Sequence, residues 1–151
     1  MANLDLAQKI DIRRDPICGL VRATAFITAA QIVGLGASTT GEISLWTIPA
    51  GSVILMARVK NGGTTFATLS TLTASLGITG ATTAIMAAET ILLANANATT
   101  GVAVATQGIY AETAAKAITV EFTGDVNLST ATGGSPGGVR VDMAWIEPIV
   151  I

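Results

Sequence analysis

Apolar and polar residues alternate along much of the chain, and this period of two predicts half-buried β-strands. In the last such segment, Val139, Val141 and Met143 would face inward, whereas Arg140 and Asp142 would face outward. Turn signals rich in glycine, proline and asparagine separate these segments. The predicted extended segments cover residues 20–27, 42–47, 52–60, 64–76, 102–105, 109–110, 116–123, 126–129 and 139–146.

Two local patterns interrupt the strands. The run Asn61-Gly62-Gly63 predicts a hairpin, because asparagine and glycine tolerate positive φ angles. Residues 82–94 predict one short helix, with Ile85, Ala88 and Leu92 on a single stripe. About eight strands with turns between them predict an all-β fold, an antiparallel β-sandwich closed as a jelly roll or a similar barrel. A single helix among these strands argues against a βαβ fold.

Residues 1–16 differ from the rest because they carry six charged side chains. Leu4, Ala7 and Ile10 recur at helical spacing, and Asn3 could cap a short turn that Pro16 would end. We therefore divide the chain into an N-terminal arm, 1–16, and a β-sandwich domain, 17–151. The arm is either a frayed terminus or a segment that reaches a neighbouring subunit. In the second case its partner contacts would be Leu4, Leu6, Ile10, Arg13 and Arg14.

The composition excludes several kinds of chemistry. The 151 residues include no histidine and one cysteine, so the chain has no Ser-His-Asp relay and no zinc site of the usual type. A formal charge of −2 with eight basic residues argues against nucleic-acid binding. The chain is 50% hydrophobic, yet it has no run of 18 apolar residues for a membrane span. Cys18 lies in an apolar run and is predicted to be buried.

Carboxylates are the remaining candidates for acid–base chemistry. Glu42, Glu89, Glu112, Glu121, Asp125, Asp142 and Glu147 are scattered and form no motif. We interpret them as solvated or interface-facing side chains, and we predict no enzyme, no cofactor and no metal site. Trp46 and Trp145 fall on strands and are predicted to be core residues rather than binding platforms.

A family resemblance rests on three features of the sequence. Strands 45–48 and 52–55 meet at a Pro49-Ala50-Gly51 corner, the chain opens with Met1-Ala2-Asn3-Leu4-Asp5-Leu6, and it has a final strand at 138–145. With the bias to alanine, threonine and glycine, these features resemble the capsid decoration, or cement, proteins of tailed bacteriophages. The resemblance covers nearly the whole chain and implies a jelly-roll-like β-fold.

The same resemblance implies a structural virion protein that is made in the host cytoplasm. It would bind the capsid exterior and link major capsid proteins by non-covalent contacts, as a homo-oligomer, either dimer or trimer. It implies no catalytic residues, and the apolar loops 34–41 and 94–101 become further candidate contacts.

Three alternatives remain open. One is a phage fibre or baseplate module that binds a host glycan or protein receptor, although an aromatic content of 4% argues against sugar stacking. Another is a histidine-free enzyme that uses carboxylates. The third is an unrelated self-assembling protein, such as a non-phage shell or surface-layer component.

Overall fold

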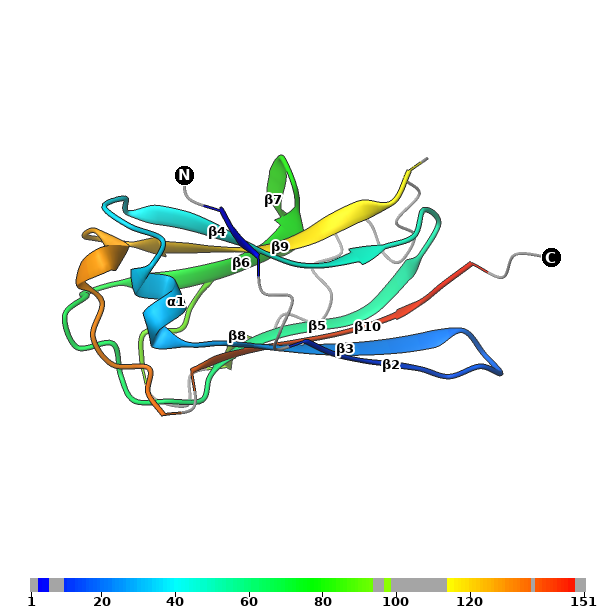
Figure 1. The fold of residues 1–151 in the computed structure, drawn as a ribbon, viewed down its shortest axis with the longest axis horizontal. Coiled ribbons are helices and arrows are strands. Elements are labelled where there is room, and N and C mark those ends of the chain that lie inside the picture. Colours follow the sequence, from blue (N-terminus) through cyan, green and yellow to red (C-terminus); the bar gives the residue numbers. More distant parts are fainter. Residues whose placement is uncertain (1–2, 6–9, 94–96, 99–113, 137, 149–151) are drawn as a thin grey trace.

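Two five-stranded β-sheets face each other as a sandwich (Figure 1). The computed structural model describes residues 3–5, 10–93, 97–98, 114–136 and 138–148. We name each sheet after its central strand. The β9 sheet has the order β1 (Asn3–Asp5), β4 (Thr40–Ile48), β9 (Lys116–Gly124), β6 (Leu72–Ile78), β7 (Ala81–Thr90). The β10 sheet has the order β2 (Ile10–Arg14), β3 (Leu20–Ile27), β10 (Val139–Ile146), β5 (Val53–Asn61), β8 (Asn97–Ala98).

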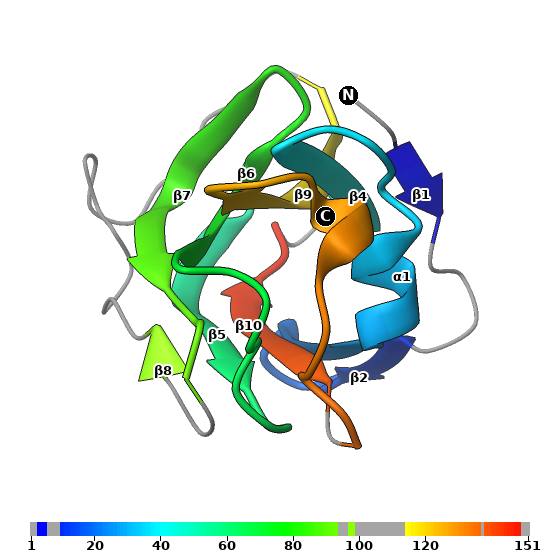
Figure 2. The ribbon, with the colours of Figure 1, turned by 90° about the vertical axis from the view of Figure 1, so that its left-hand side faces the viewer.

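The order of the strands confirms the predicted antiparallel β-sandwich. The strands β3, β4, β5 and β6 alternate between the two sheets along the chain, as in a jelly roll. Among the described strands, all pairings are antiparallel except that of β1 with β4, which is parallel. The short helices α1 (Ala29–Val33) and η1 (Leu128–Thr130) lie beside each other at one end of the sandwich (Figure 2).

The core fills the space between the sheets, and period-two alternation predicted much of it correctly. In β3, β9 and β10 the predicted inward residues are buried, and Phe122 and Val139 are fully so. Trp46 and Trp145 are 6% and 1% exposed, and their rings stack with centroids 6.1 Å apart. Both tryptophans are therefore core residues, as predicted.

Two β-bulges break the predicted alternation. In β4 the pairing with β9 shifts between Ser44 and Thr47, so that Leu45 and Trp46 are both buried. In β5 the pairing with β10 passes from Met56 to Ile54 and leaves Leu55 without a partner position. Leu55 and Met56 consequently both face solvent, although alternation would have placed Leu55 on the face opposite Met56.

The predicted helix at 82–94 is wrong, because residues 81–90 form strand β7. Of the predicted stripe only Ile85 is buried, whereas Ala88 is exposed and Leu92 is half-buried beyond the end of the strand, and the pairing with β6 is irregular. The structure instead places a helix at 29–33, which the sequence analysis missed. Thr28 and Gln31 form a capping box there, in which each side chain accepts a hydrogen bond from the other residue's backbone N–H.

Other local predictions also need correction. Residues 3–5 and 10–14 are strands rather than a helical turn, because they extend the edges of the two sheets. The predicted strand at 126–129 is replaced by η1, and Cys18 is exposed in the β2–β3 turn rather than buried. The predicted strands at 102–105 and 109–110 lie outside the described residues. The division of the chain at residue 16 stays a prediction.

The predicted hairpin at Asn61-Gly62-Gly63 is instead a corner where the chain leaves the β10 sheet. Asn61 is fully buried, and its Nδ2 lies 3.1–3.2 Å from the carbonyl oxygens of Thr64, Ile91 and Leu93. Its Oδ1 accepts a 2.9 Å hydrogen bond from the Gly63 N–H. The Asn61 side chain thus provides hydrogen bonds to backbone N–H and C=O groups that have no strand partner at this corner.

Replacing Asn61 with alanine should lower the free energy of unfolding by about 2–4 kcal/mol, because several buried polar groups lose their partner. Asn127→Ala is the control, since Asn127 is exposed and its side chain makes no cap hydrogen bond. The control should change stability by less than about 0.5 kcal/mol. Urea unfolding followed by tryptophan fluorescence measures both, and equal losses in the two variants would contradict the role of Asn61.

Candidate partner-binding face

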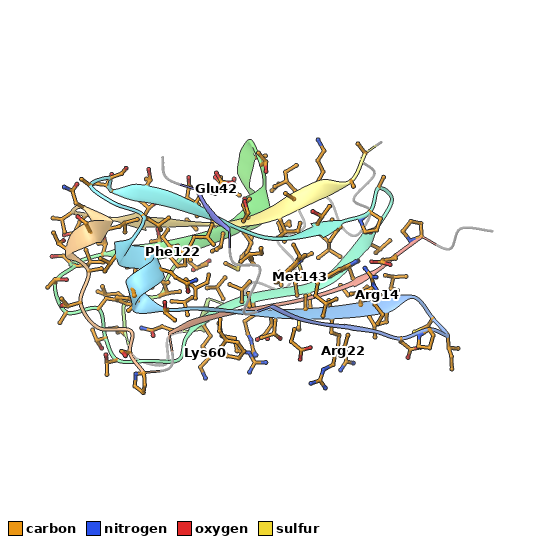
Figure 3. The ribbon with its side chains drawn as sticks, in the orientation of Figure 1. Arg14, Arg22, Glu42, Lys60, Phe122 and Met143 are labelled. Atoms are coloured by element: carbon orange, nitrogen blue, oxygen red, sulfur yellow. The ribbon has the colours of Figure 1, made fainter. Side chains whose placement is uncertain are left out.

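The outer face of the β10 sheet, which we call the arginine face, carries an unusual share of the charge. Five of the eight basic residues of the chain lie on it, with two acidic ones. The face is therefore positive on a chain whose net charge is −2. Figure 3 shows Arg22 and Lys60 projecting outward from this sheet, on the side away from the β9 sheet. Its charged residues are Asp11, Arg13, Arg22, Arg58, Lys60, Arg140 and Asp142.

Strand pairing arranges the centre of the face as three rows across β3, β10 and β5. The register sets one residue from each strand side by side in every row. The rows are Arg22–Ala144–Met56, Thr24–Asp142–Arg58 and Phe26–Arg140–Lys60. Residues distant in sequence are therefore neighbours on this face, with Asp142 in the middle.

The Asp142 carboxylate holds this arrangement together. Its side chain is 7% exposed, and Oδ2 accepts hydrogen bonds from Nη2 and Nε of Arg58 at 2.6 and 3.2 Å. Oδ1 accepts from Nε of Arg140 at 2.7 Å and from the Thr24 hydroxyl at 2.8 Å. Burial raises the pKa of Asp142, but the hydrogen bonds from Arg58, Arg140 and Thr24 outweigh it and hold the pKa below the ordinary value.

A hollow of about 500 Å³ opens on this face beside the buried carboxylate. Arg22, Arg58 and Arg140 line it together with apolar side chains, among them Leu55 and Met56. Leu55 and Met56 are 48% and 45% exposed because of the bulge in β5. Within the described part of the chain, the Arg22 side chain makes no hydrogen bond and no ion pair.

Phe26 extends the apolar part of the face beside the hollow. Phe26 is 44% exposed, and the Arg140 guanidinium lies 5.7 Å from its ring centroid. This cation–π contact and the hydrogen bond to Asp142 together fix the Arg140 side chain. The face thus combines arginines in fixed positions with exposed apolar side chains, a mixture typical of protein interfaces.

The outer face of the β9 sheet has the opposite character. Glu42 on β4 and Glu121 on β9 lie directly opposite each other in the register, and Figure 3 shows Glu42 on the outer side of this sheet. The Thr82 hydroxyl lies 3.1 Å from Oε1 of Glu121. Oε1 of Glu42 is buried and makes no hydrogen bond within the described residues. The two like charges therefore face each other with little compensation.

The contacts predicted for the arm fall into two groups. Leu4 lies on β1 beside Ile43, Ile10 lies on β2 opposite Ala25, and Leu6 is outside the described residues. The two strands belong to different sheets, β1 to the β9 sheet and β2 to the β10 sheet. Their role as partner contacts stays a prediction.

The two predicted arm arginines point to opposite sides of β2. Arg13 lies on the arginine face, where its Nε is 3.1 Å from Oδ2 of Asp11. Arg14 faces the other side of β2, and its Nη2 lies 3.1 Å from Oε1 of Glu147. Arg13 therefore lies on the same face as the hollow, and the contact role of both arginines stays a prediction.

Arg22, Arg58 and Arg140 are not among the contact residues predicted from the sequence. Their exposure on one side of a sheet could be predicted, because each is an outward residue in a predicted strand. Within the described residues, no three metal-ligating side chains of the His, Cys, Asp or Glu type come together. No helix among those residues is long and apolar enough to cross a membrane.

Comparison with known proteins assigns the chain to no family. No protein-family model and no curated protein matches the chain. Among solved structures, a chain described as "Cyanophage Pam1 capsid asymmetric unit" is similar, with a TM-score of 0.48 and 21% sequence identity. The match covers 92% of this chain and 85% of that chain. At this TM-score and identity the likeness alone assigns no function.

Replacing Asp142 with asparagine should cost about 1–3 kcal/mol at pH 7, because two arginines lose their buried counter-charge but remain partly exposed to water. The pKa of Asp142 is lowered in the folded state, so its stabilisation is complete above its ordinary value of 3.8. It is lost as the pH falls through the folded-state value. The difference in unfolding free energy between the wild type and D142N should therefore shrink below about pH 4.

Urea unfolding at several pH values measures that difference. Asp11→Asn is the matched control, since Asp11 is exposed on the same sheet and should contribute less than about 1 kcal/mol. A D142N penalty that stays constant down to pH 3 would contradict the proposed charge pairing.

Replacing Glu42 with glutamine should raise the free energy of unfolding by about 0.5–1 kcal/mol, because a like-charge cross-strand pair becomes an amide–carboxylate pair. Glu89→Gln on β7 makes the same charge change away from the pair and should have a smaller effect. Chemical denaturation at pH 7 compares them, and a less stable E42Q variant would contradict this interpretation.

Proposed function

We propose that the protein is a structural virion protein that binds the outside of a tailed-phage capsid and links major capsid proteins by non-covalent contacts. The observation that carries the proposal is the arginine face, where arginines held in place lie beside exposed apolar side chains. Arginine, methionine and phenylalanine are enriched at protein interfaces, and all three are present here. A cementing role needs such a surface and no chemistry.

The resemblance of the sequence to phage cement proteins supports the same proposal and supplies the partner. The predicted jelly-roll-like fold agrees with the sandwich described above. An exterior position and a dimeric or trimeric state follow from the resemblance alone, and they are part of the proposal.

The glycan-binding alternative finds no support in the described residues. Sugar recognition commonly uses exposed aromatic rings, but Trp46 and Trp145 are buried in the core. The exposed ring of Phe26 already contacts the Arg140 guanidinium. No specific observation favours a carboxylate enzyme either, because Asp142, the most deeply buried carboxylate among the residues described, is committed to two arginines.

The proposal is tested by mixing the purified protein with empty shells of the phage that carries its gene. Wild-type protein should sediment with the shells and raise their resistance to heat. Leu55→Asp combined with Met56→Asp should lower occupancy by about tenfold or more, because two exposed apolar contacts become charged.

Val126→Asp is the matched control, since Val126 is 42% exposed but follows β9 rather than lying on the arginine face. This variant should bind the shells like the wild type. Wild-type protein that fails to sediment with the shells would overturn the proposed function. Full occupancy of the Leu55 and Met56 double variant would show that another surface is used.

A further inference from the structure

We infer that the hollow on the arginine face binds an acidic, partly apolar segment of a partner protein, with a carboxylate of that segment held by Arg22. The inference names the partner chemistry for the face described above, and it rests on the proposed function only for the identity of the partner. The hollow lies where Arg22, Ala144 and Met56 form one row across three strands.

The shape of the hollow follows from this row. Ala144 lies between Arg22 and Met56. Its side chain is small, so a space remains above it, and the two larger side chains form the sides of that space. Ala144 is 8% exposed, so it forms the floor rather than a wall. Leu20 and Leu55 add further apolar surface. An extended peptide segment could therefore lie across the row, with its side chains in contact with Arg22 and with the apolar walls.

The charge of the hollow is not balanced by the described residues. Arg58, Arg140 and Arg22 contribute three positive charges, against the single carboxylate of Asp142. Each guanidinium has five N–H donors, and the contacts with Asp142 use two of Arg58 and one of Arg140. The Arg58 and Arg140 side chains are 37% and 45% exposed, so their remaining donors are accessible.

A carboxylate suits this donor set better than a nucleic acid does. A guanidinium binds a carboxylate through two parallel hydrogen bonds, and Arg22 makes none within the described residues. The apolar walls fit the side chains that flank such a carboxylate in a protein segment. A long polyanion would instead meet a chain whose net charge is −2.

Asp142 preorganises two of the arginines that line the hollow. Because its carboxylate already fixes Arg58 and Arg140, less side-chain entropy is lost when a second acid binds. Arg22 lies one row away and is free of this network, so it can be changed without disturbing the buried carboxylate. This separation makes Arg22 the residue on which to test the inference.

The test measures binding of a fluorescent nine-residue peptide in which glutamate and leucine alternate, by anisotropy with the full-length protein. The same peptide with glutamine in place of glutamate should bind about tenfold more weakly, because the charge-assisted hydrogen bonds are lost. Arg22→Gln should weaken binding of the glutamate peptide by about fivefold or more. Ala144→Met, which fills the floor without changing charge, should weaken both peptides.

Lys60→Gln is the matched control, because it removes the same charge from the same face but does not line the hollow. It should change binding by less than about twofold. Equal binding of the glutamate and glutamine peptides, or no effect of Arg22→Gln and Ala144→Met, would overturn the inference. Tighter binding of a phosphoserine peptide or a single-stranded oligonucleotide would overturn the choice of a carboxylate.

The peptide-binding experiment and the shell-binding experiment test the two proposals separately, so either result can be negative without the other. Peptide binding without shell binding would leave the acidic-segment site intact and remove the capsid as its partner. Shell binding that Arg22→Gln and Ala144→Met leave unchanged, together with no peptide binding, would remove the site and leave the proposed function intact.

Discussion

The buried carboxylate of Asp142 is the interaction on which the arginine face depends. It can reach Thr24, Arg58 and Arg140 at once only because β3, β10 and β5 are paired in one register. A shift of one residue in either pairing would turn these side chains to the opposite face. The carboxylate also offsets repulsion between two arginines that lie on adjacent strands. Sheet register and surface charge are therefore coupled through this one group.

The core and the two outer faces are connected by the same strands. The bulge at Leu55 leaves Ile54 and Ala57 in the core while it exposes Leu55 and Met56 together, which supplies an apolar wall of the hollow. Across the sandwich, Glu42 and Glu121 give the β9 sheet the opposite sign. A charge distribution of this kind orients a protein as it approaches a partner, even when the net charge is small.

Much of the fold could be predicted from alternation, because a strand with one buried face repeats every two residues. In strands β3, β9 and β10 every second residue is buried as predicted, although the outward positions Thr119, Asp142 and Ala144 are buried as well. Strict alternation fails where tertiary pairing introduces a bulge or an irregular register, as at the buried neighbours Leu45 and Trp46 and in β7. The helix at 29–33 was missed although its capping box, Thr28 with Gln31, is visible in the sequence.

The candidate site was harder to predict, because its charge is gathered by strand pairing rather than by sequence. Arg140 and Asp142 lie two residues apart on one strand, and their shared face follows from alternation alone. Arg58 joins them across 84 residues, and no local pattern specifies that β5 pairs with β10. The run of charges near residues 11–15 is more conspicuous in the sequence, yet the pleat of β2 sends its two arginines to opposite sides. A face of this kind becomes visible only once the register of three strands is known.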